Sequence, residues 1–172
     1  MRSDKALLPF HGRTLVEHIA LQVQQAAGSI TLVGDPARYS YLGYPVIADI
    51  FPESGPLAGI HAALVASRAD WNLIVACDMP EVTAEFLSRL LDRAEQGSAS
   101  AVLPAGPSGL PEPLCAAYSR RAVESIAAAL ERNTRKVLDG LAGLEIDLWR
   151  VPDPRYFQNL NTPQNWNCYG HD

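Results

Sequence analysis

The residue whose type and position best suit chemistry is Asp78. It directly follows Trp71–Cys77, a continuous apolar run typical of a strand that is buried on both faces of a sheet. In α/β sheets the ligand lies beyond the carboxyl ends of the strands, and a carboxylate there offers the hard oxygen that Mg²⁺ prefers. A turn aspartate ahead of Pro80 is the plainer interpretation of the same residue. Asp78 is therefore the candidate metal ligand.

Other strand ends and one helix start offer contacts for a nucleotide. Asp49 follows a short strand and can accept hydrogen bonds from a nucleobase edge, although an aspartate in a turn is commonplace. The Gly34-Asp35 pair follows another strand. The segment at 55–59 presents small residues and N–H groups that a base or phosphate can approach closely, while tight helix packing explains the same composition. Its members are Gly55, Pro56, Leu57, Ala58 and Gly59.

Cations and amides form a third group of candidates. Lys5 can neutralise a triphosphate, and Arg135 with Lys136 can bind another phosphate at the start of a short helix. A solvated surface position is the alternative for each of the three. Asn159 and Asn161 stand one residue apart before a helix start, where they either orient a ligand or cap the helix.

Several classes of chemistry find no support in the chain. The four histidines have no metal-like spacing, and there is neither a Gly-x-Ser-x-Gly nucleophile elbow nor a phosphate-binding P-loop. The three cysteines, Cys77, Cys115 and Cys168, are odd in number and far apart, so we expect them to be reduced and structural.

The bulk composition predicts one domain that binds small molecules. A chain of 172 residues, 48% of them hydrophobic, can build one substantial core, so we expect residues 1–172 to form a single domain. A net charge of -5 argues against a nucleic-acid partner. No apolar run approaches the roughly 18 residues of a membrane span, and the first ten residues lack a signal-peptide layout. We therefore expect a cytoplasmic protein without a membrane partner.

The pattern of elements predicts a three-layer α/β/α fold with a mostly parallel sheet, because strands alternate with helices. Thr14 and Glu17 form a capping box at the start of a helix that Gly28 ends. Further helices are expected at 55–66, 83–96, 119–130 and 134–141 and after 162, and strands at 30–33, 44–48, 71–77, 100–104, 114–118 and 144–148.

Six short motifs, taken in order, resemble those of the molybdenum cofactor guanylyltransferases, which are nucleotidyltransferases with a Rossmann-like domain. Each motif is weak alone, but their order, spacing and placement at strand ends are together specific, and they cover nearly the whole chain. The Cys-Asp-Met-Pro form favours the guanylyl branch over the cytidylyl and sugar-nucleotide branches. The motifs are Asp4–Phe10 followed by Gly12–Leu15, Gly55–Gly59, Cys77–Pro80, Glu112–Leu114 and Asn159–Pro163.

The resemblance implies that the GMP moiety of GTP passes to molybdopterin, with Mg²⁺ as cofactor and pyrophosphate as product. On this basis Lys5 contacts the nucleotide phosphates, Asp49 and the Gly34-Asp35 region contact the guanosine, and Asp78 holds magnesium. Asn159, Asn161, Arg135 and Lys136 would lie on the molybdopterin side. Other proteins of cofactor synthesis and the target molybdoenzymes are further expected partners.

The chain departs from the family pattern at its beginning. The family starts with a hydrophobic strand and a Gly-rich loop that lead into Met-Gly-x-Asp-Lys, whereas here Met1-Arg2-Ser3 precede Asp4 and Lys5. A segment on the order of 15 residues, a central strand and the phosphate-binding loop, is thus expected upstream.

Three alternatives remain open from the sequence. One is a related enzyme that uses CTP or acts on a sugar phosphate. Another is a nucleotide-binding homologue that binds a partner without turnover. The third is a chain that does not fold stably without the upstream strand.

Overall fold

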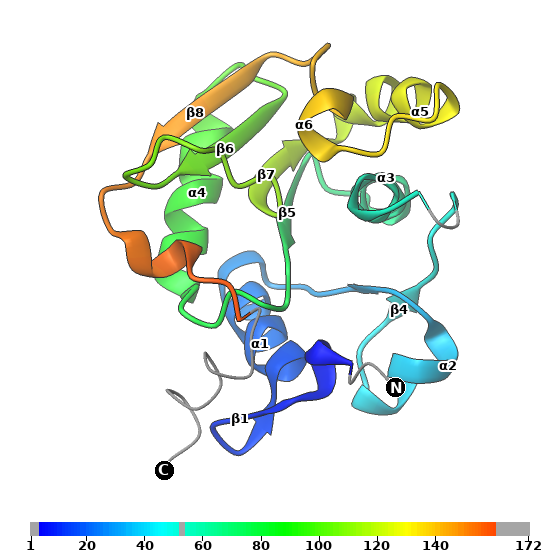
Figure 1. Ribbon diagram of the computed structural model, residues 1–172, viewed down its shortest axis with the longest axis vertical. Coiled ribbons are helices and arrows are strands. Elements are labelled where there is room, and N and C mark those ends of the chain that lie inside the picture. The colour runs from blue at the N-terminus through cyan, green and yellow to red at the C-terminus, as the bar shows by residue number, and fades with distance from the viewer. Residues whose placement is uncertain (1–3, 52–53, 161–172) are drawn as a thin grey trace.

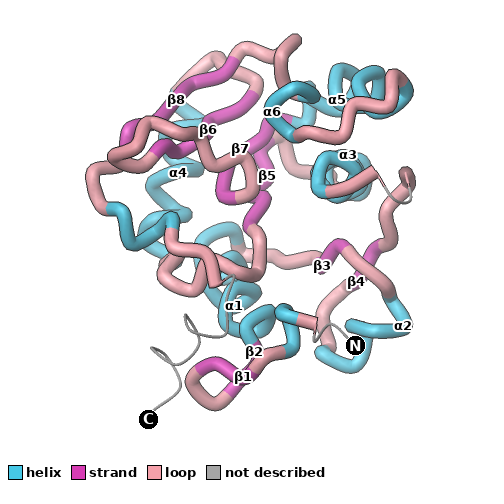
Figure 2. Tube along the Cα trace, viewed as in Figure 1, coloured by secondary structure: helices cyan, strands magenta, loops and turns pink. Residues whose placement is uncertain are grey.

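The computed structural model describes residues 4–51 and 54–160. Helices pack on both faces of a four-stranded sheet, and a second pair of strands lies apart from it (Figures 1 and 2). No helix in the described part of the chain is both long and apolar enough to cross a membrane. The α/β class and the layered architecture expected from the sequence are confirmed.

The strands fall into three groups. The main sheet has the order β5-β7-β6-β8, with bounds Trp71–Val75, Cys115–Ser119, Ala101–Ala105 and Ile146–Arg150. A parallel pair joins β3 (Leu32–Val33) to β4 (Val46–Ile47), and an antiparallel hairpin joins β1 (Pro9–Phe10) to β2 (Arg13–Thr14).

The main sheet is mixed, which corrects the expectation of a mostly parallel one. β8 pairs with β6 in parallel, but β7 is antiparallel to both β6 and β5. The reason lies in the connection between β6 and β7, which spans only 106–114 and contains no helix. A parallel return requires a crossover of about a dozen residues or more, so this short loop brings the chain back antiparallel.

The helices begin and end largely where the sequence signals predict. Thr14 and Glu17 make the capping box, and Gly28 ends the first helix in the left-handed conformation at φ 74°. The α-helices are α1 (Leu15–Ala27), α2 (Pro36–Tyr39), α3 (Pro56–Ala66), α4 (Ala84–Gln96), α5 (Val123–Glu131) and α6 (Val137–Gly140). The 3₁₀ segments are η1 (Lys5–Leu7), η2 (Ser40–Leu42), η3 (Arg120–Ala122) and η4 (Pro154–Phe157).

The hydrophobic core lies on both faces of the main sheet. Because successive strand residues point to opposite faces, Ala116 and Tyr118 of β7 pack towards α3 and α5, whereas Ala117 packs towards α4. Leu57 at the start of α3 belongs to the first cluster and is fully buried. The start of α3, where the nucleotide candidates lie, is thus fixed to the sheet by core packing.

A close contact between α3 and α6 gives a test of this packing. A Cβ atom on the buried Gly140 would overlap Cδ2 of Leu57 and lie 2.9 Å from its Cδ1. We expect Gly140→Ala to destabilise the protein by about 1–3 kcal/mol, because neither backbone nor core can yield freely. The melting temperature should fall by roughly 3–10 °C. Gly97→Ala is the control, because its Cβ atom would meet backbone oxygens only at 3.5 Å or more; equal melting temperatures for both variants would contradict the packing account.

β5, at the edge of the main sheet, is less buried than its apolar sequence predicts. All five residues of β5 are half-buried. Among the described strands β5 pairs only with β7, and β3 pairs only with β4. A cavity of about 460 Å³ separates the edges of β5 and β3, so no described strand covers that side of β5.

Candidate functional site

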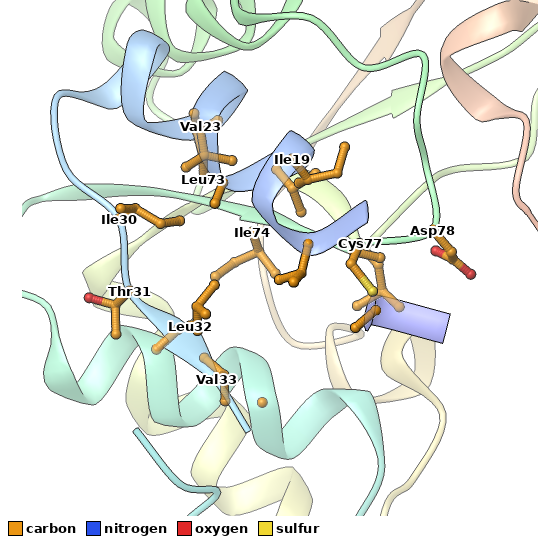
Figure 3. Close-up of a pocket in the computed structure, with 18 of the residues that line it drawn as sticks. Ile19, Val23, Ile30, Thr31, Leu32, Val33, Leu73, Ile74, Cys77 and Asp78 are labelled. Carbon is orange, nitrogen blue, oxygen red and sulfur yellow. The ribbon is translucent and has the colours of Figure 1, made fainter. Parts of the chain in front are cut away.

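Apolar side chains line most of this cavity. Ile19 and Val23 of α1, Ile74 of β5 and Leu32 of β3 surround the same space (Figure 3). Asp78 stands at one end, with its carboxylate directed away from the apolar side chains (Figure 3). Lys5, Tyr39, Pro56 and Gly59 also line the cavity, so candidates from η1, α3 and the end of β5 meet around one opening.

Asp78 lies where its place after a strand predicts, at the carboxyl end of β5. Its side chain is half-buried, and its backbone carbonyl accepts a hydrogen bond of 2.9 Å from the N–H of Leu160. Asn159 is therefore brought next to Asp78, as expected if both serve one site. Asn161, the other predicted amide, lies outside the described residues.

Glu112 is a second carboxylate at this edge; it belongs to the motif Glu112–Leu114, but the sequence alone predicts no site role for it. The β5–β7 ladder pairs Val75 with Cys115 and continues through the 2.7 Å bond from Ala76 N–H to the Leu114 carbonyl, which brings Glu112 towards Asp78. Burial, and then the charge of Asp78, raise the pKa of the Glu112 carboxyl. Two half-buried carboxylates at one strand end repel each other, and a bound cation would stabilise their charged forms.

The cysteines at the sheet are poor nucleophiles. Burial, followed by the neighbouring charges of Asp78 and Asp4, raises the pKa of the Cys77 thiol to about 11. Burial likewise raises the pKa of Cys115 to about 12. Both are free thiols, and both stay protonated near neutral pH, which agrees with a structural role. Cys168 lies outside the described residues.

The nucleotide candidates differ in what they can offer. The start of α3 has no side-chain cap, and Gly55 adopts φ 71°, a conformation that disfavours other residues. Leu57 and Ala58 are fully buried, and the Ala58 N–H donates to the Gly55 carbonyl at 3.1 Å, so the accessible members of this segment are Gly55, Pro56 and Gly59. Asp49 lies against the same helix, since a Cβ atom on Gly59 would be 3.7 Å from its Oδ1; burial raises the pKa of the Asp49 carboxyl.

Gly34 and Asp35 have structural roles in the turn after β3. A Cβ atom on Gly34 would lie 2.8 Å from the ring of Tyr39, so the ring can approach only because residue 34 is glycine. The Oδ1 atom of Asp35 accepts a 2.9 Å hydrogen bond from the N–H of Ala37 and caps α2. Their expected contact with the guanosine remains a prediction.

The basic pair lies next to the start of α3. The backbone oxygen of Arg135 would be 3.9 Å from a Cβ atom on Gly55, which places this loop at the start of α3. The Arg135 Nε donates to Oδ1 of Asn133 at 3.3 Å, and Lys136 precedes α6. Arg135 is thus beside the nucleotide candidates, whereas Asn159 is beside Asp78.

A histidine fixes the loop that carries Asp78. His18 Nε2 lies 3.0 Å from the Pro80 carbonyl, to which its N–H donates. Burial lowers the pKa of His18 despite this hydrogen bond, so the folded state favours the neutral ring. The resulting stabilisation is complete above the unfolded-state pKa of about 6.5 and is lost as the pH falls through the lower folded-state pKa.

We therefore expect the melting temperature to fall between pH 7.5 and pH 5, and to fall less in His18→Gln. Thermal unfolding monitored by circular dichroism measures both slopes. The same slope in the parent and in His18→Gln would show that His18 does not titrate as described.

Known proteins are similar to this chain over nearly its whole length. The probable molybdenum cofactor guanylyltransferase of Flavobacterium johnsoniae is 29% identical over 169 residues, covering 97% of this chain and 88% of that protein. The molybdenum cofactor guanylyltransferase of Vibrio atlanticus is 30% identical, covering 97% and 87%. The crystal structure of molybdopterin-guanine dinucleotide biosynthesis protein A from Archaeoglobus fulgidus superposes with a TM-score of 0.80 at 27% identity, covering 96% of this chain and 88% of that one.

The family comparison covers most of the chain. Residues 1–145 match the MobA-like NTP transferase domain, a span that includes β5, Asp78, Glu112 and the start of α3. The chain therefore belongs to the MobA-like NTP transferase domain family.

Proposed function

We propose that this protein transfers the GMP moiety of GTP to molybdopterin. An oxygen of the terminal phosphate of molybdopterin forms a bond to the α-phosphorus of GTP, and the bond between the α-phosphorus and the bridging oxygen breaks to release pyrophosphate. Two relatives that cover nearly the whole chain carry this activity in their names. The observation that carries the proposal is the meeting of Asp78, Lys5 and the start of α3 around one cavity along the edge of β5, with Asp78 at its end.

Magnesium fits the carboxylates at this strand end. In phosphoryl-transfer sites Mg²⁺ is typically held by one or two carboxylates together with substrate phosphates. Asp78 is the ligand in this proposal, and Glu112 is close enough for its pKa to be raised by the charge of Asp78. When bound, the cation would neutralise charge on the reacting phosphates. Asp78 and Glu112 would hold the cation at the sheet edge, and its positive charge would offset the repulsion between the two carboxylates.

The remaining charges of the triphosphate are assigned to η1 and α3. Lys5 supplies a positive charge, and the exposed Gly55 and Pro56 let a phosphate approach the positive end of α3. Asp49, with Gly34 and Asp35, is assigned to the guanosine. A reaction of this kind depends on positioning and charge neutralisation more than on a protein nucleophile, which agrees with protonated cysteines at the site.

Molybdopterin is assigned to the side of Asp78 that carries Asn159, and Asn161 follows it in the chain. Arg135 and Lys136 are assigned to a phosphate, and their position beside Gly55 favours a contact shared with the nucleotide. In this proposal the protein works in the cytoplasm, where GTP is available, together with other proteins of cofactor synthesis or target molybdoenzymes.

We also propose that residues 1–172 belong to one domain whose sheet is completed by a strand between β3 and β5. Both neighbouring edges border the cavity, and its walls are apolar on the sides of α1 and β5. Lys5 and Ala6 line the same cavity, so polypeptide leading into Asp4 would enter at the end where Asp78 stands. A strand here would run in the same direction as β5 and join the separate strand groups into one sheet.

Equilibrium dialysis with Mg²⁺ and each labelled nucleoside triphosphate tests the choice of nucleotide. We expect GTP to bind more tightly than CTP. We expect Asp49→Asn to weaken the binding of GTP but not that of CTP, so that the two affinities become more similar. Asp92→Asn on α4 is the control for an aspartate remote from the cavity. Preferential binding of CTP would reassign the protein to a cytidylyl-transfer reaction.

A further inference from the structure

The carboxylate of Asp4 connects two parts of the candidate site that are far apart in sequence. Its Oδ1 accepts a 3.2 Å hydrogen bond from the N–H of Ala6 and caps η1, whose first residue is Lys5. Its Oδ2 accepts hydrogen bonds from the Tyr39 hydroxyl at 2.7 Å and from Arg38 Nη1 at 3.1 Å. Both of these donors belong to α2, so each oxygen of one side chain holds a different element.

The second element begins at the predicted nucleoside contact. α2 starts at Pro36, two residues after Gly34, and is capped by Asp35. The Tyr39 ring packs against Gly34, and both Tyr39 and Lys5 line the cavity. A shift of α2 would therefore move the turn after β3, and a loss of the Asp4 contacts would release η1 from it.

The contacts of Asp4 with Ala6, Tyr39 and Arg38 are here called the joint. The pKa shifts at the joint match a fixed structural connection between η1 and α2 better than a ligand contact. Burial alone would raise the pKa of Asp4, but the hydrogen bonds from Tyr39, Ala6 and Arg38 hold it below its ordinary value. Burial and the bond to Asp4 raise the pKa of Tyr39 to about 12, so the hydroxyl keeps its proton and donates. The side chain of Asp4 is 23% exposed, and its charge is balanced by Arg38. A carboxylate would repel a phosphate, so Asp4 is unsuited to bind one directly. By fixing η1 it can instead hold the cation Lys5 in the position that a phosphate needs.

We propose that Asp4, held by Tyr39 and Arg38, is a positioning residue that fixes Lys5 relative to the Gly34-Asp35 turn. The phosphate side and the nucleoside side of the site are thereby kept at one separation before GTP binds. This inference rests on the proposed function for the identity of the ligand. The joint itself rests only on the contacts among Asp4, Tyr39, Arg38 and Ala6.

Two variants weaken the joint without removing the η1 cap. Tyr39→Phe deletes one donor and keeps the ring on Gly34. Asp4→Asn retains an oxygen that can cap η1, but its amide turns N–H groups towards the donors on α2. Tyr44→Phe is the matched control, because no described hydrogen bond of Tyr39 or Asp4 involves Tyr44.

The first experiment is amide hydrogen exchange on the full chain without nucleotide. The joint predicts faster exchange at Leu7 and Leu8, whose N–H groups bond within η1, in Tyr39→Phe and Asp4→Asn but not in Tyr44→Phe. Unchanged exchange at these two amides in both variants overturns the joint, whatever the protein does with GTP.

The second experiment is a double-mutant cycle between Tyr39→Phe and Lys5→Ala, read as the KM for GTP and kcat separately. If Tyr39 acts through Lys5, Tyr39→Phe lowers kcat/KM about tenfold, chiefly through KM, in the parent. In the Lys5→Ala background it then has no further effect. Equal effects in both backgrounds overturn the role through Lys5. Absence of GTP turnover in a folded parent overturns the proposed function, while the exchange experiment still decides the joint.

Discussion

Replacing Asp78 by asparagine is expected to lower the rate of guanylyl transfer by about a thousandfold while the fold persists. A metal that stabilises charge on the reacting phosphates contributes several kcal/mol, and about 1.4 kcal/mol corresponds to a tenfold change in rate. Asparagine keeps the shape of the side chain but removes the negative charge that holds the cation. The backbone carbonyl of residue 78 still accepts the hydrogen bond from Leu160, so the strand end keeps its geometry.

The measurement is the initial rate as a function of Mg²⁺ concentration, with the melting temperature as a check on folding. Asp92→Asn is the matched control, since α4 carries it on an exposed surface. Glu112→Gln should lower the rate less than Asp78→Asn does, and it should raise the Mg²⁺ concentration needed for half-maximal rate. It should also stabilise the fold at neutral pH, because it removes the repulsion between Glu112 and Asp78. A folded Asp78→Asn protein with near-normal rates would remove Asp78 from the chemistry.

Supplying an apolar strand upstream of Asp4 is expected to stabilise the protein by about 3 kcal/mol. Each buried Val or Ile side chain contributes about 1.5–3 kcal/mol, and ordering the backbone costs about 1–2 kcal/mol per residue. For a strand of about five residues the difference is a few kcal/mol, which corresponds to a rise in melting temperature of roughly 10 °C. Hydrogen exchange should slow at the facing edges of β3 and β5, because the strand would pair with both.

The control for this prediction is an extension of equal length in which the apolar residues are replaced by serine and asparagine. This polar extension should leave unchanged the melting temperature and the exchange at Val33 and Val75, whose N–H groups alternate with those that bond to β4 and β7 and so face the open edges. Equal effects of the two extensions would contradict the strand proposal. Strong protection of these amides in the unextended chain, increasing with protein concentration, would show that a second copy covers the edge instead.

Much of the fold could be predicted because its signals are local. The capping box of Thr14 and Glu17 specifies the start of α1, and Gly28 its end. The apolar run before Asp78 predicts both β5 and the place of the carboxylate after it. These predictions need only neighbours in sequence, and the structure confirms them.

The features that were missed depend on contacts between distant segments. The sequence signals predict no helix at Pro36–Tyr39, because a helix of four residues is too short to show a periodicity, and its contacts with Asp4 come from a distant segment. The proximity of Glu112 to Asp78 follows from the β5–β7 register, which the sequence does not fix. The antiparallel return of β7 and the half-buried state of β5 likewise arise from pairing, not from composition.

The most direct test of the account is the formation of molybdopterin guanine dinucleotide from GTP, molybdopterin and Mg²⁺. The chain as printed and the same chain with an added apolar strand and loop before Met1 are assayed side by side for this product and for pyrophosphate. We expect product and pyrophosphate in equal amounts from GTP, with the higher rate in the extended form, in which the added strand would complete the sheet. If both forms are folded and neither makes the dinucleotide, the central claim is contradicted, and a binding role without turnover takes its place.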